Sequence, residues 1–269
     1  MSEQVSDFIG DIPTHYDQGL GSVIFDDYAS DISRRAEKLS PASVLELASG
    51  TGIVSRKLRN ALPVTTKLTV TDLNPPMLEV ARGKFSTGQN VEFQQADAMN
   101  LPFDDNSFDL VVCQFGVMFF PDKVASYKEV KRVLRPGGTY LFNAWVTNSE
   151  NPFSEITQKL SEELFPDNPP GFYRVPFSYA DADQVIADLD SAGLTDATAE
   201  TVEFLKPIID LDAFARGIVF GNPIYDEISN RDEGDPAMFM AHVKERFEAT
   251  WGTTDPKVPL KATVYSSRA

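Results

Sequence analysis

Short apolar runs alternate with helical patterns through the first half of the chain. The runs have the length and the β-branched or aromatic content of buried strands, and they lie at residues 43–48, 68–73, 91–95, 108–115 and 139–145. The stretches between them, such as 53–61 and the helix that begins at Asp122, carry apolar residues every three or four positions. Strands and helices that alternate with short links predict parallel strands, right-handed crossovers and helices on both faces of a sheet.

The pattern is weaker on both sides of this region. Residues 12–17 are expected to form a loop that leads into a helix over 24–39, and Pro41 ends that helix. In the following strand–helix units, Asn74 is expected to cap a helix that runs to about Phe85. Beyond residue 150, we expect helices over 152–165, 181–192, 211–220 and 236–251, and strands over 197–205 and 260–266.

These elements describe one α/β domain, although 269 residues would also accommodate two small domains. We expect a doubly wound, Rossmann-like, seven-stranded and mostly parallel sheet with helices on both faces. Residues 1–40 would form an N-terminal helical cover, 41–146 the ligand-binding core, and 147–269 the substrate-side elements. A helical insertion over 208–256, between the last two strands, is interpreted either as a lid or as plain packing against the sheet.

Composition narrows the function classes. A hydrophobic fraction of 42% and a charged fraction of 24% are ordinary for a soluble globular protein, and a net charge of −16 opposes broad contact with nucleic-acid phosphates. One cysteine, Cys113, and two histidines, His15 and His242, argue against a disulfide framework and against cysteine-rich or multi-histidine metal sites. We therefore expect no metal and no nucleic-acid partner. No run approaches the roughly 18 apolar residues of a membrane span, and the first ten residues are not a secretory signal, so a cytoplasmic location is expected.

The chain is organised around a glycine turn after the first strand, Glu46-Leu47-Ala48-Ser49-Gly50-Thr51-Gly52. Glycine lets a ligand approach the backbone closely, and the free N–H groups of the helix that follows face such a ligand. A nicotinamide site would have the pattern G-x-G-x-x-G, which Gly50, Gly52 and Ser55 approximate. Glu46 favours another ligand, because a carboxylate repels a pyrophosphate and attracts a cation.

Four motifs, in order, resemble those of class I S-adenosylmethionine-dependent methyltransferases, above all the small-molecule branch typified by ubiquinone/menaquinone biosynthesis methyltransferases. They are the glycine turn at 46–52, Thr71-Asp72-Leu73-Asn74-Pro75-Pro76-Met77-Leu78, Ala96-Asp97-Ala98-Met99-Asn100-Leu101-Pro102-Phe103 running into Ser107-Phe108-Asp109, and Leu134-Arg135-Pro136-Gly137-Gly138. The resemblance spans roughly residues 40–146. It implies a Rossmann-like fold with S-adenosylmethionine as cofactor and S-adenosylhomocysteine as product.

The resemblance also implies a cofactor site built from the strand ends and the N-terminal cover. Two glycines and a backbone carbonyl would contact the methionine part of the cofactor. Asp72 would accept hydrogen bonds from both ribose hydroxyls and Asp97 one from the adenine amino group, and Leu73, Met77 and Ala98 would pack around the purine. The residues expected in this site are Tyr16, Glu46, Ala48, Gly50, Gly52, Asp72, Leu73, Met77, Asp97, Ala98, Gln114 and Phe115. The three acids also have structural interpretations: Asp72 as a helix cap, Asp97 as a turn former and Glu46 as a packing or ion-pair residue.

Methyl transfer from such a cofactor is an in-line displacement at carbon, so the protein mainly aligns the acceptor and excludes water. We expect a small organic acceptor, methylated on oxygen, carbon or nitrogen, that is aromatic or quinol-like. The candidates for a general base are His15 in the N-terminal segment and His242 in the possible lid. The aromatic residues that would line an acceptor pocket are Tyr16, Phe25, Tyr28, Phe119, Phe120, Trp145, Phe172 and Tyr173.

Two other hypotheses stay open. A nicotinamide-dependent oxidoreductase is opposed by Glu46 and by the missing third glycine, whereas a catalytically silent cofactor-binding protein is favoured by the lack of a clear base. The chain lacks the cysteines of arsenite methyltransferases. It carries Gln114-Phe115-Gly116-Val117 where enzymes that methylate amide or base nitrogens have an Asn-Pro-Pro-Tyr-type motif, which weighs against nucleic-acid targets.

Overall fold

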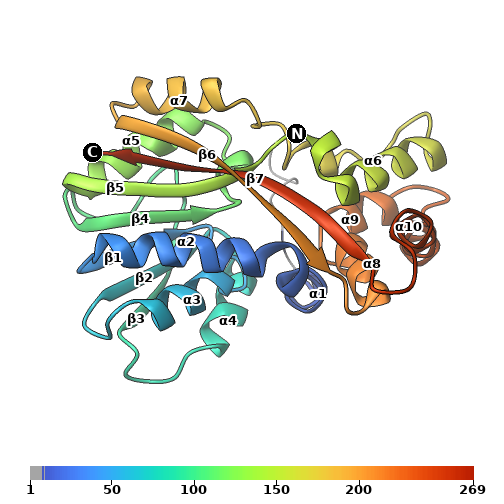
Figure 1. The fold of residues 1–269 in the computed structure, drawn as a ribbon, viewed down its shortest axis with the longest axis horizontal. Helices are drawn as coiled ribbons and strands as arrows, with labels where there is room; N and C mark the ends of the chain where they lie inside the picture. Colours follow the sequence, from blue (N-terminus) through green and yellow to red (C-terminus); the bar gives the residue numbers. More distant parts are fainter. Residues whose placement is uncertain (1–7, 9) are drawn as a thin grey trace.

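A computed structural model describes residue 8 and residues 10–269 of the chain. Its elements are, in chain order, α1 (Ile12–Gly19), the π-turn η2 (Gly21–Phe25), α2 (Asp26–Leu39), β1 (Ser43–Leu47), α3 (Ile53–Ala61), β2 (Lys67–Asp72), α4 (Pro75–Gly83), β3 (Val91–Gln95), β4 (Phe108–Gln114), the 3₁₀ turn η3 (Val117–Phe119), α5 (Lys123–Val133), β5 (Leu134–Trp145), α6 (Pro152–Leu164), α7 (Ala182–Ser191), β6 (Thr195–Pro207), α8 (Leu211–Phe220), α9 (Ile224–Ser229), α10 (Pro236–Trp251) and β7 (Lys257–Arg268). Figure 1 shows their arrangement.

The seven strands form one sheet in the order β3-β2-β1-β4-β5-β7-β6. The strands β1 to β5 are parallel, and β7 runs antiparallel to both β5 and β6. The strand order reverses between β1 and β4, which makes that point the topological switch where ligands of such sheets bind. The predicted fold class, a doubly wound and mostly parallel seven-stranded sheet, is confirmed.

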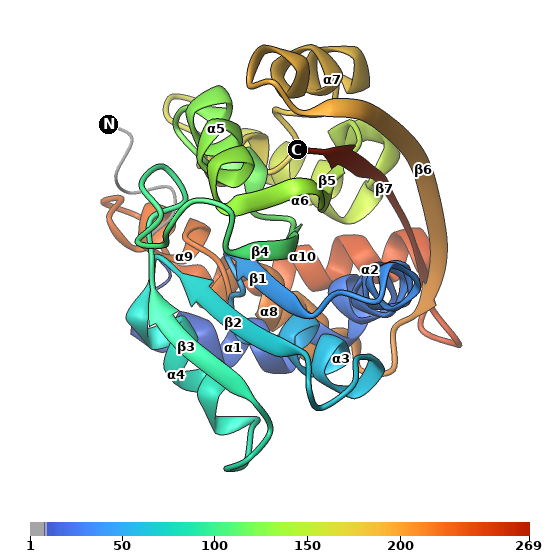
Figure 2. The same ribbon diagram turned by 90° about the vertical axis from the view of Figure 1, so that its left-hand side faces the viewer.

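Helices lie on both sides of the sheet in Figure 2, and an apolar core lies under the helices of each face. One packs α2, α3 and α4 against residues such as Val44, Val70 and Val112, and the other packs α5 and α7 against residues such as Leu45 and Tyr140. The second core continues into the group of helices α6, α8 and α10, which lies beside the sheet in Figure 1. No helix within residues 10–269 has the length and apolar character that a bilayer span requires.

The N-terminal residues 12–17 differ from the sequence prediction, because they form the helix α1 rather than a loop. Tertiary packing stabilises this short helix: a Cβ on Gly19 would lie 2.6 Å from the Cα of Gly217, and one on Gly221 would lie 2.8 Å from the N of Tyr16. Three glycines thus bring the backbones of α1 and α8 into direct contact, which no local pattern in residues 12–17 encodes. The short helix α9 was likewise not predicted.

Smaller differences concern element ends. Asn74 occupies the N-cap position of α4, but its side chain does not cap the helix; its Nδ2 donates to Asp72 Oδ1 at 3.3 Å instead. The helix α4 ends at Gly83 rather than near Phe85. The strand β5 begins at Leu134, and residues 135–138 form a bulge opposite the single residue Asp109 of β4. The predicted helical insertion between the last two strands is present, and it consists of α8, α9 and α10 between β6 and β7.

Candidate functional site

A cavity of about 650 Å³ lies at the carboxyl ends of β1, β2, β3 and β4. Parallel sheets of this topology bind ligands at that edge. Eleven of the twelve residues predicted for the cofactor site line it: Tyr16, Glu46, Ala48, Gly50, Asp72, Leu73, Met77, Asp97, Ala98, Gln114 and Phe115. The structure therefore brings together side chains from five separate stretches of the sequence.

Gly52 is the exception, because it does not line the cavity. A Cβ at this position would lie 2.7 Å from the Cβ of Ala81 in α4, and the residue has a φ of +81°. Gly50 also has a positive φ, of +54°, but a Cβ there would meet nothing within 4 Å. Gly52 thus allows the start of α3 to pack against α4, whereas Gly50 provides the backbone conformation of the turn beside the cavity.

The glycine turn has a strained backbone between β1 and α3. Ala48, a residue with a Cβ, has a φ of +49°, and the turn is held by hydrogen bonds from Ser49 N to Thr71 O and from Gly52 N to Ser49 O. No side chain caps the N-terminus of α3. Strained backbone persists where the surroundings hold it and clusters at ligand sites, and uncapped N–H groups attract acceptor atoms of a ligand.

Asp72 anchors the turn from the neighbouring strand. Its Oδ2 accepts from Gly50 N at 2.8 Å, and its Oδ1 accepts from Asn74 N at 2.8 Å. The side chain is buried, and this burial raises the pKa of the carboxyl, while the N–H groups of Asn74 and Gly50 pull the pKa down. A carboxylate offers about four lone-pair positions, so acceptor capacity toward the cavity is left after these bonds.

Glu46 lies in β1 on the face of the sheet that α3 covers, and it is 1% exposed. Burial, and to a smaller extent the nearby Asp72 carboxylate, raises the pKa of its carboxyl, and the facing Ser55 hydroxyl and N–H lower it; the net pKa is about 8. The contact with Ser55 is loose, because neither Glu46 Oε2 nor Ser55 Oγ has a hydrogen-bond partner of good geometry. At neutral pH the Glu46 carboxyl is therefore mostly protonated, and a cation beside it would lower this pKa and restore the negative charge that the sequence suggested.

Several other buried polar atoms around the turn have no partner. They are Ser49 Oγ, Thr51 Oγ1 and Gln114 Oε1. Gln114 Nε2 donates to Phe25 O at 3.3 Å, which fixes the amide orientation and leaves Oε1 as the unpaired acceptor. Buried polar groups in proteins are almost always hydrogen-bonded, so this concentration of unpaired atoms indicates a polar ligand at the turn.

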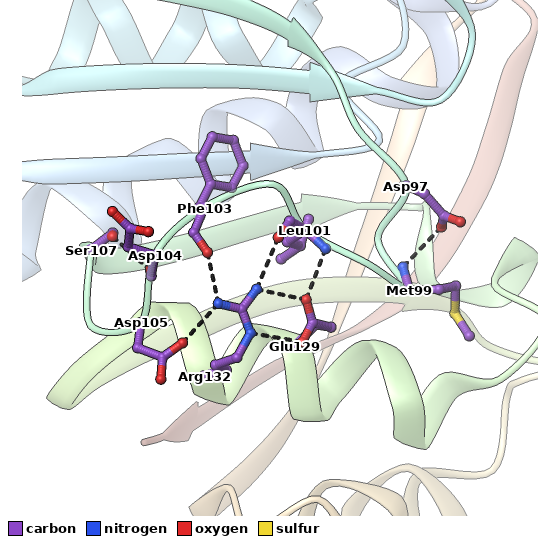
Figure 3. Close-up of polar contacts among 9 residues, drawn as sticks. All are labelled: Asp97, Met99, Leu101, Phe103, Asp104, Asp105, Ser107, Glu129 and Arg132. Atoms are coloured by element: carbon purple, nitrogen blue, oxygen red, sulfur yellow. Dashed lines mark hydrogen bonds and ion pairs between the residues drawn. The ribbon is translucent and has the colours of Figure 1, made fainter.

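The far wall of the cavity has a different character. Asp97 follows β3 and is exposed, and its Oδ1 accepts from Met99 N at 2.9 Å (Figure 3). Leu73 is half exposed at the cavity mouth, and Met77 on α4 is buried. Together with Ala98, these apolar side chains form a slot next to a single carboxylate, a combination that suits a flat ring with an amino group.

Phe115 marks the end of β4 with a φ of +51°. Its N donates to Asn143 Oδ1 at 2.9 Å, and its ring stacks on Trp145 with centroids 3.9 Å apart. Of the eight aromatic residues proposed for an acceptor pocket, Tyr16, Phe25, Phe119 and Phe120 line the cavity, and Tyr28, Trp145, Phe172 and Tyr173 do not.

Phe8 is a cavity residue that the sequence did not reveal. Its ring contacts Tyr16 edge-on, with centroids 5.8 Å apart, and lies 6.2 Å from Phe119. Phe8 precedes the first helix and belongs to no periodic pattern, so nothing in the sequence distinguished it from the other phenylalanines.

The structure brings neither candidate base to the cavity. His15 packs against Phe220 of α8, with ring centroids 5.7 Å apart, and His242 lies on α10 with its Nδ1 3.7 Å from Glu245. Burial, together with the nearby Asp72 and Asp17 carboxylates, raises the pKa of the Tyr16 hydroxyl far above its usual range. Tyr16 therefore keeps its proton at neutral pH.

Comparison with known proteins agrees with this geometry. Residues 44–138 match the family described as methyltransferase domain. A segment of 121 residues is 44% identical to the ubiquinone/menaquinone biosynthesis C-methyltransferase UbiE of Hahella chejuensis, and it covers 44% of this chain and 47% of that protein. A segment of 139 residues is 34% identical to the demethylmenaquinone methyltransferase of Staphylococcus saprophyticus and covers 51% and 60% of the two chains.

The chain thus spans about half the length of the curated relatives it matches. It resembles class I methyltransferases of the ubiquinone/menaquinone type, as its four motifs suggested. Among solved structures, phosphoethanolamine N-methyltransferase 2 of Haemonchus contortus, in complex with phosphomonomethylethanolamine and S-adenosylhomocysteine, has a TM-score of 0.59. The match is 16% identical and covers 95% of this chain and 56% of that one, so it shows that the two proteins share this fold.

Proposed function

We propose that this protein transfers a methyl group from S-adenosylmethionine to a small organic acceptor. The single observation that supports this most is the pair of buried carboxyls, Glu46 and Asp72, beside the glycine turn of one cavity. Asp72 can accept a hydrogen bond from a ribose hydroxyl. A cation bound beside Glu46 would favour the ionised form of that carboxyl. A pyrophosphate would find two acids and no cation at the same place, which opposes the nicotinamide alternative.

The residues present fit this cofactor. Gly50 and the Ala48 carbonyl would hold the methionine part, Asp72 the ribose, and the slot of Leu73, Met77 and Ala98 the adenine beside Asp97. When bound, the cofactor supplies a methyl group already activated by its sulfonium. The protein's task is to align the acceptor and to exclude water. The rings of Tyr16 and Phe25, which line the cavity and stack with centroids 5.0 Å apart, would serve that purpose.

The acceptor is proposed to be a neutral, flat, quinol-like molecule. Among the residues that the structure describes, the acids Glu46, Asp72 and Asp97 are the charged residues of the cavity wall, and the remaining sequence, residues 1–7 and 9, contains no Lys, Arg or His. An anionic acceptor would therefore lack a cationic partner. The rings of Phe8, Phe119 and Phe120 offer apolar contact instead, in keeping with the quinone-related names of the relatives.

The division of labour along the chain is part of the proposal. Residues 1–40 would cover the cofactor, 41–146 bind it, and 147–269 support the acceptor side, with 208–256 as a possible moving lid. The glycine contact between α1 and α8 supports a coupling of cover and lid, because the backbones of the two helices touch.

The test is incubation of the protein with methyl-labelled S-adenosylmethionine and a panel of quinols, phenols and organic acids. The proposal expects label on a neutral ring compound and little or none on the acids. Cofactor binding without turnover on the whole panel would favour a catalytically silent binding protein. Fluorescence titration with NADH tests the oxidoreductase alternative, and saturable NADH binding at the same cavity would contradict the proposal.

A further inference from the structure

The guanidinium of Arg132 on α5 uses all five of its N–H donors, as Figure 3 shows. Nε and Nη2 donate to the two oxygens of Glu129, each at 2.8 Å. Nη1 donates to Phe103 O at 2.7 Å and to Asp105 Oδ1 at 2.9 Å, and Nη2 also donates to Leu101 O at 2.9 Å. Arginine offers five donors in a fixed planar fork, so this arrangement is saturated and geometrically determined.

Glu129 completes the contact from the same helix. Its Oε2 accepts from Leu101 N at 2.8 Å, so the pair binds both the N–H and the carbonyl oxygen of one loop residue. The end of the loop is also tied to α5, because Asn106 N donates to Arg132 O at 2.9 Å. The helix α5 therefore holds the segment between β3 and β4 at two points. Side chains of α5 bind the middle of the segment at Leu101, and the backbone of α5 binds its end at Asn106.

This segment carries part of the cavity wall. Asp97, Ala98 and Met99 line the cavity, and they begin only two residues after β3. Their own hydrogen bonds are local: Met99 N donates to Asp97 Oδ1 at 2.9 Å, and Asn100 N to Asp97 O at 3.0 Å. The start of the segment is tied to the opposite wall, because Gln95 Nε2 donates to Leu73 O at 2.8 Å and Ala96 N donates to Asp72 O at 3.1 Å. The bonds of Asp97 shape the turn beyond that point, and the contacts with α5 hold the following residues at Leu101.

We propose that Glu129 and Arg132 are positioning residues for the cofactor site, which set the width of the slot between the loop of Ala98 and the wall of Leu73. The ligand named in this inference rests on the proposed function, whereas the placement of the loop does not. Neither Glu129 nor Arg132 lines the cavity, so the effect of the ion pair on a ligand passes through the backbone of residues 97–103.

The experiment compares the wild type with Arg132→Lys, Glu129→Gln and the control Lys131→Met. Lysine keeps the charge of Arg132 but cannot form the fork. Lys131 is the adjacent residue of α5, and its Nζ donates to Gly193 O at 2.6 Å, away from the cavity. The first readout is amide hydrogen exchange of the ligand-free protein over residues 97–107, and the second is the affinity for S-adenosylhomocysteine with the KM and kcat for S-adenosylmethionine.

We expect faster exchange at Leu101 and an affinity about tenfold weaker in Arg132→Lys and Glu129→Gln, with wild-type behaviour in Lys131→Met. The KM for S-adenosylmethionine should rise, while kcat at saturating cofactor should remain at the wild-type value. A general loss of stability would instead lower the amount of active enzyme and therefore the apparent kcat. Unchanged exchange at Leu101, or faster exchange with unchanged affinity, overturns the inference. If the wild type itself does not bind S-adenosylhomocysteine, the proposed function fails, and the exchange measurement alone decides whether the pair positions the loop. If Arg132→Lys does not fold, Glu129→Gln carries the test.

Discussion

The Oδ2 of Asp72 accepts a hydrogen bond from the N of Gly50, at 2.8 Å, across the gap between β2 and the glycine turn. One carboxylate therefore has two tasks: it holds the turn in its positive-φ conformation and faces the cavity. Its other oxygen is held by Asn74 N, so the side chain has no freedom to rotate without losing a backbone partner. The site is in this sense built before any ligand arrives, which reduces the entropy lost on binding.

Replacing Asp72 with asparagine should weaken the binding of S-adenosylhomocysteine by about 5- to 150-fold. The amide places an NH₂ group against one of two backbone N–H donors, and an unsatisfied buried group costs about 1–3 kcal/mol. Titration calorimetry measures the change. A matched control is Asp109→Asn at the opposite end of the sheet, where Asp109 Oδ2 accepts from Ser43 N at 2.8 Å. That variant should lose stability but keep its affinity, and an equal loss of affinity in both variants would contradict a specific role for Asp72.

Glu46 should make the stability of the protein depend on pH. Because burial raises its pKa from 4.5 to about 8, the folded state keeps a proton that the unfolded state releases. The contribution of Glu46 to stability is therefore fully present below about pH 4.5 and is lost as the pH rises through about 8. Glu46→Gln cannot ionise, so its melting temperature should exceed that of the wild type increasingly from pH 5 to pH 8.5. Parallel melting curves for the two proteins across that range would refute this.

The same pKa predicts proton release on ligand binding. A cationic ammonium beside Glu46 favours the ionised carboxylate, so binding at pH 7 should expel part of a proton. The observed heat of binding of S-adenosylhomocysteine should then differ between two buffers with different ionisation enthalpies. Glu46→Gln should remove that difference, and a buffer-dependent heat that survives the substitution would assign the proton to another group.

The two glycines of the turn should respond differently to alanine. Gly52→Ala places a Cβ 2.7 Å from the Cβ of Ala81, so we expect a loss of about 1–3 kcal/mol from overpacking in addition to the positive-φ penalty. Gly50→Ala meets open space and should lose only about 1–2 kcal/mol. Urea denaturation measures both. Ala81→Gly should partly rescue Gly52→Ala in a double-mutant cycle, and additive losses would show that the clash is not the cause.

Much of the core could be predicted from the sequence because its information is local. Each strand–helix unit and the glycine turn are encoded by neighbouring residues, as are Asp72 at the end of β2 and Asp97 after β3. The topology then brings the turn and the two acids to one edge of the sheet. The helix α1 could not be predicted in this way, since the backbone contacts of Gly19 with Gly217 depend on residues nearly 200 positions apart. The contacts of Phe8 and Gly52 are likewise made with residues distant in the sequence. For this reason Phe8 was not predicted to line the cavity, and Gly52 was expected to contact the ligand although it packs against Ala81. The raised pKa of Glu46 follows from its burial. A single acid within an apolar run suggests that the side chain is buried, but the degree of burial follows only from the structure.

Titration calorimetry of the wild-type protein with S-adenosylhomocysteine tests the central claim most directly. The account predicts one site per chain, with a dissociation constant on the order of micromolar and a heat signal that Asp72→Ala abolishes. No detectable binding by the folded wild-type protein, or binding that Asp72→Ala leaves unchanged, would contradict the assignment of this cavity to S-adenosylmethionine.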